Sequence, residues 1–192
     1  MSTAALLLTG GASRRLGTDK ARLVVDGERL VDRLARLLLA ECTPVLEVGP
    51  GYGSLSAVRE EPPGAGPLAA VAAGAEALDA GGHVGPVIVM AVDLPGVTAE
   101  LVAWLRAHPT SASLVPVVDD VAQVLCARYS ADALGRVSGL VERGKRSMHA
   151  LVEVTTVHRA GIEEWGPVAD AAAFADVDSR AEAAAAGIDL PR

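Results

Sequence analysis

The sequence predicts an α/β fold with three layers, in which helices cover both faces of a mainly parallel sheet. Short apolar runs of strand length alternate along the chain with amphipathic stretches of helical period. One of these runs, Val87–Val92, is apolar throughout, which is typical of a strand in the middle of a covered parallel sheet. The 192 residues contain no repeat and no linker, so we expect a single domain over residues 1–192.

The first half of the chain alternates regularly between strands and helices. Strands are predicted at Ala4–Thr9, Pro44–Val48 and Val87–Val92. Helices are predicted around the leucines at 30–38, at Pro67–Leu78, and from a Thr98 cap to about Ala107. This order suits units of strand, helix and parallel strand.

The second half of the chain is less regular. Strands are predicted at Ser113–Val118, Val124–Tyr129, Glu153–Val157 and Phe174–Val177, the first two pairing across the turn near Asp119. Helices are predicted at Ala131–Glu142 and Met148–Val152. Ser179 and Glu182 form a capping-box pattern before a last, alanine-rich helix.

Composition restricts the class of partner. The net charge is −7 and aromatic residues make up 3% of the chain, which disfavours a broad nucleic-acid-binding surface but not a local cationic pocket. No apolar stretch reaches the ~20 residues of a membrane span, and Ala4–Leu8 is too short for a signal peptide. We therefore expect a cytoplasmic protein without a membrane partner, in which Cys42 and Cys126 are buried thiols.

The loop after the first strand, Gly10–Lys20, combines glycines with three cations, Arg14, Arg15 and Lys20. Glycines let backbone N–H groups approach phosphate oxygens, so the loop is a plausible triphosphate cradle. It lacks the spacing of a P-loop and of the dinucleotide-binding glycine motif. The alternative from the residues alone is a solvated turn.

Two further loops carry carboxylates near the carboxyl ends of predicted strands, where open α/β sheets bind ligands. Asp93 follows the central strand and suits either a Mg²⁺ bridged to phosphates or the cap of a turn. Asp176 and Asp178 lie two residues apart on a predicted extended segment, so we expect at most one of them to share a site with Asp93. Asp178 can instead cap the last helix.

The segment Glu61–Leu68 contains several prolines and glycines, which predict a rigid loop with free backbone groups. Such a loop can bind the edge of a base through its main chain, or can simply connect a strand to the next helix. The four histidines, His83, His108, His149 and His158, are scattered along the sequence with no motif around them, and we assign none of them a catalytic role.

Taken together, these loops resemble the motifs of the molybdenum cofactor guanylyltransferase family, whose members have a MobA-like NTP transferase domain. The resemblance rests on Leu7–Ala21, Gly64–Ala69, Val92–Pro95, Gly144–Ser147 and Asp176–Ser179, which occur in family order between residues 6 and 186. Aspartates at 176 and 178 stand where the family usually has asparagines. The resemblance implies a Rossmann-like nucleotidyltransferase fold of α/β/α layers with a mainly parallel mixed sheet.

The resemblance also implies an activity: transfer of GMP from GTP to the terminal phosphate of molybdopterin, with Mg²⁺ as cofactor and pyrophosphate as the second product. Catalytic roles fall on Arg15, Lys20 and Asp93, and metal binding on Asp93 and Asp178. The nucleotide-binding positions are Leu8, Thr9, Gly10, Gly11, Arg15, Lys20, Glu61, Gly66 and Asp93. Proteins that insert or accept the molybdenum cofactor are implied as partners, and the oligomeric state stays open.

Two other functions compete with this one. The first is a sibling nucleotidyltransferase that uses CTP or another phosphorylated acceptor. The second is a nucleotide-binding accessory protein without turnover, against which the presence of Arg15, Lys20 and Asp93 argues.

Overall fold

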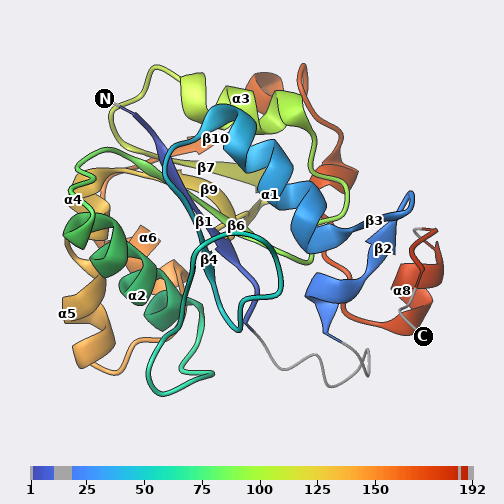
Figure 1. Cartoon of the computed structure of the whole chain (residues 1–192). Coiled ribbons are helices and arrows are strands. Elements are labelled where there is room, and N and C mark those ends of the chain that lie inside the picture. Colours follow the sequence, from blue (N-terminus) through green and yellow to red (C-terminus); the bar gives the residue numbers. More distant parts are fainter. Residues whose placement is uncertain (1, 11–18, 186, 190–192) are drawn as a thin grey trace.

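A mixed sheet forms the centre of the protein in the computed structural model, which describes residues 2–10, 19–185 and 187–189 (Figure 1). Its strands are β1 (Ala4–Leu8), β4 (Val45–Val48), β5 (Ala57–Val58), β6 (Val87–Ala91), β7 (Ser113–Val118), β8 (Val121–Ala122), β9 (Cys126–Tyr129) and β10 (Val157–Ala160). They lie in the order β10-β7-β9-β6-β1-β4-β5, and β8 pairs with β7. A separate two-stranded ribbon consists of β2 (Val24–Val25) and β3 (Glu28–Arg29).

The pairing is mainly parallel, as predicted. β1 is parallel to both β4 and β6, β4 is parallel to β5, and β7 is parallel to β10. β9 is antiparallel to β6 and β7, between which it lies. Parallel strands end at the same edge of a sheet, so the loops that follow β1 and β6 leave the sheet side by side.

Helices cover both faces of this sheet, which confirms the predicted three layers (Figure 1). One face is covered by α1 (Leu30–Glu41), α3 (Ala99–Ala107) and α7 (Ile162–Trp165). The other is covered by α2 (Pro67–Ala80), α4 (Ala131–Leu134), α5 (Val137–Glu142) and α6 (His149–Val154). Side chains of β1 alternate between the two layers, with Leu7 in the first core and Leu6 in the second.

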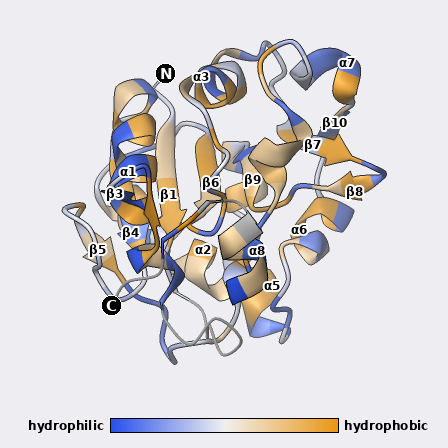
Figure 2. Cartoon of the chain, turned by 90° about the vertical axis from the view of Figure 1, so that its right-hand side faces the viewer, coloured by the Kyte–Doolittle hydropathy of each residue, from blue (hydrophilic) through white to orange (hydrophobic). Residues whose placement is uncertain are grey.

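The central strands are buried along their whole length. All five residues of β1 and all five of β6 are buried, and Figure 2 shows the middle of the sheet in hydrophobic colours. The uninterrupted apolar runs of the sequence therefore predicted these two strands correctly. Both cysteines are buried and free, and burial raises the pKa of Cys42 and of Cys126 to about 12.

The predicted helix caps are present. The Thr98 side chain accepts a hydrogen bond from the N–H of Leu101 at the start of α3. Ser179 and Glu182 form the reciprocal capping box, with Oγ of Ser179 accepting from the N–H of Glu182 and the carboxylate of Glu182 accepting from the N–H of Ser179. This box begins α8 (Arg180–Ala185). None of the helices in the described ranges combines the length and the apolar character that crossing a bilayer requires.

Two predicted elements were wrong in part and a third was wrong altogether. The helix predicted at Ala131–Glu142 is split into α4 and α5 at Gly135, a residue of low helix propensity. The strand predicted at Glu153–Val157 begins only at Val157, because α6 continues to Val154. The strand predicted at Phe174–Val177 does not form: Phe174 ends the 3₁₀ helix η2 (Ala171–Phe174), and an irregular segment follows.

Close packing between α2 and the sheet generates a stability prediction. A Cβ on Gly74 of α2 would lie 2.6 Å from one methyl carbon of Leu6 and 3.0 Å from Cγ2 of Val48. Both neighbours are fully buried, so neither can move aside easily. We expect Gly74→Ala to destabilise the protein by about 1–3 kcal/mol through overpacking, measured by chemical denaturation.

Gly139 in α5 supplies the matched control, because a Cβ there would meet only the end of the Arg143 side chain, at 3.4 Å. Alanine favours a helix interior over glycine by up to about 1 kcal/mol, so Gly139→Ala should leave stability unchanged or raise it. Equal stability of the two variants would contradict the close packing of α2 on β1.

Candidate active site

Three predicted site residues from distant parts of the sequence meet beyond the carboxyl end of β6. Lys20 lies in the 3₁₀ helix η1 (Lys20–Arg22), Asp93 follows β6, and Asp178 precedes α8. Nζ of Lys20 donates to Oδ2 of Asp93 at 2.7 Å and also to Oδ1 of Asp178. The side chains of Lys20 and Asp93 are only 18% and 21% exposed, so the pair is partly shielded from solvent.

The two carboxylates keep Lys20 charged. Partial burial disfavours its ammonium form, but the hydrogen bonds to Asp178 and Asp93 outweigh this effect and raise the pKa of Lys20 above 10.5. The ion pairs therefore persist throughout the neutral range and are lost only as the pH rises through this elevated pKa. The charge of Lys20 is compensated by these carboxylates, so an anionic ligand could use it only after a cation had taken its place beside them.

Asp176 joins the same cluster, which corrects the expectation that only one of the two C-terminal aspartates shares a site with Asp93. One carboxylate oxygen of each of Asp93, Asp176 and Asp178 lies within 4.8 Å of the others. The alternation rule fails because residues 175–178 do not form a strand. The N–H of Val177 instead donates to the carbonyl of Asp93 at 3.1 Å, which ties this segment to the loop after β6.

This group of carboxylates fits a hard divalent cation. Mg²⁺ prefers oxygen ligands and usually takes only one or two carboxylates, completing its shell with water and phosphate oxygens. Asp93 and Asp178 are the predicted metal ligands, and Asp176 is an additional candidate. Burial and the charges of Asp178 and Asp93 raise the pKa of Asp176, as expected for a carboxylate that lacks sufficient positive charge nearby.

Another carboxylate, Glu47, organises the edge of the sheet next to this cluster. It is completely buried in β4, and its oxygens accept hydrogen bonds from Oγ1 of Thr9 at 2.6 Å and from the N–H groups of Gly51, Tyr52 and Gly53. Thr9, a predicted nucleotide-binding residue, therefore directs its side chain into the scaffold. Its neighbour Leu8 is likewise buried, so both residues offer a ligand mainly their backbone.

The contact between Thr9 and the next strand requires a glycine. Gly49 has a φ of +152°, and a Cβ there would lie 2.3 Å from Oγ1 of Thr9. This close approach brings the end of β4 against the start of the predicted phosphate loop. Gly10 lies at this point, whereas Gly11 and Arg15 fall outside the described residues.

The loop predicted to contact the base, Glu61–Leu68, begins with an exposed carboxylate and directly follows a buried one. Glu61, the predicted residue, is exposed, whereas Glu60 is buried and accepts a hydrogen bond from the N–H of Gly64 at 2.9 Å. A Cβ on Gly10 would lie 3.8 Å from Oε1 of Glu60, so the Glu60 carboxylate lies next to the start of the phosphate loop. Sequence reasoning missed Glu60, because nothing in a Glu-Glu pair before prolines shows which one turns inward.

Gly66 connects this loop to the basic segment at residues 144–147. It has a φ of +106°, and a Cβ on it would lie 3.0 Å from the carbonyl oxygen of Arg146. The same carbonyl accepts a hydrogen bond from the N–H of Leu68 at 3.0 Å. The structure thus places Lys145 and Arg146 beside the start of α2, although they lie far from it in sequence.

Comparison with known proteins decides the family. The family profile of the MobA-like NTP transferase domain matches residues 5–160. The chain belongs to this family. It is 37% identical over 174 residues to a probable molybdenum cofactor guanylyltransferase of Mycobacterium tuberculosis H37Rv, covering 86% of each chain. It is 34% identical over 187 residues to a protein of the same name from Mycobacterium marinum, covering 92% of each.

Solved structures support the same fold. Molybdopterin-guanine dinucleotide biosynthesis protein A from Archaeoglobus fulgidus superposes with a TM-score of 0.74 at 21% identity, over 95% of this chain and 96% of that one. A 2-C-methyl-D-erythritol 4-phosphate cytidylyltransferase from Thermus thermophilus superposes with a TM-score of 0.68 at 22% identity, over 97% of each. These likenesses confirm the predicted nucleotidyltransferase fold.

The raised pKa of Asp176 predicts that its charge destabilises the metal-free protein. Because the ionised form is less favourable in the folded state, the cost is present above the elevated pKa and vanishes below the ordinary value of 3.8. We expect Asp176→Asn to raise the melting temperature at pH 7 in the presence of a chelator. Solvent screens this exposed group, so the gain is small, about 1 °C.

Glu76→Gln, at an exposed position inside α2, is the control and should change nothing. The gain for Asp176→Asn should disappear when the melting temperatures are measured below pH 3.8. A lower melting temperature for Asp176→Asn at pH 7 would show that its carboxylate stabilises the metal-free fold instead.

Proposed function

We propose that this chain is a guanylyltransferase that transfers GMP from GTP to the terminal phosphate of a molybdopterin-type acceptor. The observation that carries the proposal is the meeting of Lys20, Asp93 and Asp178 beyond the carboxyl end of β6, where α/β sheets bind their ligands. The relatives named as molybdenum cofactor guanylyltransferases, which match most of the chain, support the choice of donor and acceptor.

The reaction needs positioning and charge neutralisation more than a protein nucleophile. An oxygen of the acceptor phosphate attacks the α-phosphorus of GTP, a new P–O bond forms, and the bond to the β-phosphate oxygen breaks, releasing pyrophosphate. Negative charge gathers on the α-phosphate and on the leaving group. The ammonium of Lys20, held at this edge of the sheet by two carboxylates, would neutralise part of this charge once those carboxylates bind a metal ion.

Asp93 and Asp178 would hold a Mg²⁺ ion, with Asp176 nearby as a third carboxylate. When bound, the ion supplies charge for the phosphates of the nucleotide. Lys20 then has a second position available to its flexible side chain, turning from the carboxylates toward the phosphates. Arg15 and the glycines at 10 and 11 complete the proposed phosphate-binding set.

The segment from Glu60 to Leu68 is the proposed guanine-binding loop. Guanine presents N1–H and N2–H₂ as donors, which loop carbonyls or a carboxylate such as Glu61 would accept. Adenine presents a different pattern and would leave acceptors unpaired, at about 1–3 kcal/mol for each buried group. The acceptor side is proposed to include Lys145 and Arg146, since Arg146 packs on Gly66 beside this loop.

Four features stay predictions: the magnesium ion, the cytoplasmic location, the single domain over residues 1–192, and contacts with proteins that insert or accept the molybdenum cofactor. The magnesium ion and the partner proteins follow from the family, and the single domain and the location follow from the length and composition of the sequence.

Removing the carboxylate at Asp93 should abolish turnover. Asp93→Asn keeps the shape of the side chain but loses the charge that would balance a metal ion, so we expect pyrophosphate release to fall to background while the circular dichroism spectrum stays unchanged. Asp79→Asn is the matched control and should retain full activity. A near-normal rate for Asp93→Asn would exclude Asp93 as a required metal ligand.

Removing the ammonium of Lys20 should slow the reaction strongly. Loss of one preorganised charge contact typically costs about 3–4 kcal/mol of transition-state stabilisation, which is a factor of a few hundred in kcat/KM. Arg136→Ala removes an exposed cation just before α5 and serves as the control. If kcat/KM of Lys20→Ala lies within about threefold of the wild-type value, Lys20 acts only as a surface lysine.

The proposed nucleotide is tested by equilibrium titration of the full chain with GTP, CTP and ATP at fixed Mg²⁺. We expect GTP to bind most tightly and ATP least. If CTP bound tenfold more tightly than GTP, a difference of about 1.4 kcal/mol, guanylyl transfer would be replaced by cytidylyl transfer. Absence of saturable binding of any nucleotide would contradict both activities.

A further inference from the structure

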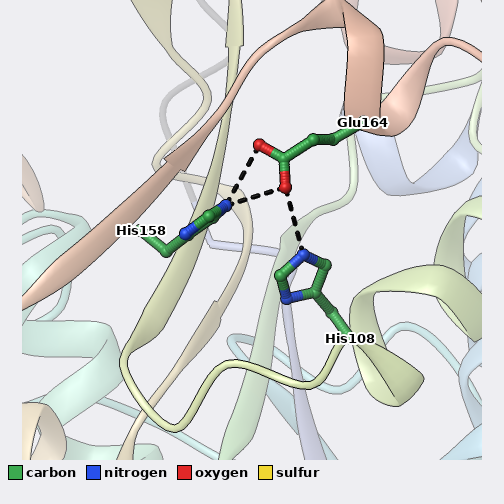
Figure 3. Close-up of side chains that lie close together, drawn as sticks. All are labelled: His108, His158 and Glu164. Atoms are coloured by element: carbon green, nitrogen blue, oxygen red, sulfur yellow. Dashed lines mark hydrogen bonds and ion pairs between the residues drawn. The ribbon is translucent and has the colours of Figure 1, made fainter.

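Two histidines that are scattered in the sequence meet a glutamate at the other end of the sheet (Figure 3). His108 follows α3, His158 lies in β10, and Glu164 lies in α7. Nε2 of His158 lies 2.8 Å and 3.0 Å from the two carboxylate oxygens of Glu164, and Nε2 of His108 lies 3.2 Å from Oε2 of the same residue. The two imidazole rings are 5.0 Å apart, centroid to centroid.

Contacts with Arg128 and Trp104 fix the position of His108. The buried guanidinium of Arg128 donates hydrogen bonds to the carbonyl oxygens of Arg106 at 2.9 Å, His108 at 3.0 Å and Thr110 at 2.6 Å. The ring of Trp104 packs edge-on against the His108 ring, with centroids 5.5 Å apart. The loop that carries His108 is therefore held in place before any ligand arrives, which lowers the entropic cost of binding one.

The donor atoms have the chemistry and the spacing of a transition-metal site. Imidazole nitrogens and a carboxylate are the donors that Zn²⁺ accepts in sites with three protein ligands and an open fourth position. In a tetrahedral site with bonds of about 2.0–2.1 Å, neighbouring donor atoms lie about 3.3 Å apart. The observed distances of 2.8 and 3.2 Å from Glu164 to the histidines are close to this value.

We propose that His108, His158 and Glu164 form a binding site for a transition-metal ion of the Zn²⁺ class, separate from the candidate active site. The side chains are 13%, 38% and 30% exposed, so an ion can enter and a water can complete its coordination. The hydrogen bond from His158 lowers the pKa of Glu164, so this carboxylate is ionised at neutral pH, as a metal ligand must be.

Hydrogen bonds alone are the competing explanation of the same geometry. The N–H of Thr110 points at Nδ1 of His108 at 3.3 Å, which leaves the proton of a neutral ring on Nε2, facing Glu164. Metal binding at Nε2 would move that proton to Nδ1 and give up the contact with Thr110. Two N–H groups would then face each other, so coordination by His108 requires the Thr110 backbone to shift, at the cost of one weak hydrogen bond.

Strand register separates this site from the candidate active site. His158 pairs with Leu114 of β7, Leu114 with Arg128 of β9, and Arg128 with Ile88 of β6. The site is therefore level with the amino end of β6, whereas Asp93 lies beyond its carboxyl end, and strand spacings put the two roughly 20 Å apart. A bound ion would clamp the edge strand β10 to α7 and to the loop after α3, which is a structural role.

The test is Zn²⁺ titration of the untagged full chain in competition with a chromogenic chelator, with millimolar Mg²⁺ present to occupy oxygen-ligand sites. We expect one Zn²⁺ per chain, and a melting temperature that rises with Zn²⁺. Groups that only orient metal ligands typically change the affinity for the metal by about 10–100-fold, and a direct ligand should matter at least as much. We therefore expect His158→Ala to weaken Zn²⁺ binding by about 100-fold or more, and Glu164→Gln by about 10-fold or more. His149→Ala is the matched control and should bind as the wild type does.

The visible absorption spectrum of bound Co²⁺ gives a second measurement, because tetrahedral coordination by imidazole produces intense bands that can be seen in the wild-type chain itself. We expect these bands in the wild-type chain and in Asp93→Asn, and their loss in His158→Ala, which lacks one of the two imidazoles. The proposal is overturned if the wild type shows no saturable Zn²⁺ binding, or if Glu164→Gln and His158→Ala bind Zn²⁺ as tightly as His149→Ala does. Nucleotide transfer by Asp93→Asn has no bearing on this result, so the two proposals fail independently.

Discussion

Three carboxylates converge beyond the carboxyl end of β6, and their mutual repulsion is the constraint around which the candidate active site is arranged. Asp93, Asp176 and Asp178 bring like charges within 4.8 Å in a chain whose net charge is already −7. Such a group persists only with a cation beside it. Lys20 supplies one positive charge and links segments 158 residues apart in the sequence. A divalent ion would bring the summed charge of the carboxylates, Lys20 and the ion to about zero, so the nucleotide phosphates would no longer be repelled.

The scaffold behind this cluster is also built on a carboxylate. Glu47 is fully buried, yet its oxygens accept four hydrogen bonds, one from Thr9 and three from the backbone of residues 51–53. A buried carboxylate is tolerated only when it is satisfied in this way. The network joins the ends of β1 and β4, so the phosphate loop starts from a fixed point. A site that depends on charge placement needs this rigidity.

Elements of the fold and of the candidate site were predicted correctly where a few neighbouring residues in the sequence determine them. The runs that became β1 and β6, the Thr98 cap and the Ser179–Glu182 box are local patterns, and each was predicted correctly. The predicted metal ligands Asp93 and Asp178 come together around Lys20, an arrangement that rested on motifs of the family.

Features that depend on tertiary packing were not predictable. Asp176 joins the cluster because its segment leaves strand geometry, and Glu60 rather than Glu61 turns inward, a choice made by the backbone of the loop. The meeting of His108 with His158 depends on the pairing of β7 with β10 and on the anchoring of the preceding loop by Arg128. No pattern in the linear sequence predicts that pairing or that anchoring.

A crystal structure of the chain with Mg²⁺ and a non-hydrolysable GTP analogue tests the central claim most directly. The account predicts a metal ion coordinated by carboxylate oxygens of Asp93 and Asp178 and by phosphate oxygens, with Nζ of Lys20 moved from the carboxylates onto the triphosphate. It also predicts the guanine base against the loop from Glu60 to Leu68. A nucleotide bound elsewhere, with Lys20 still bridging Asp93 and Asp178, would contradict it.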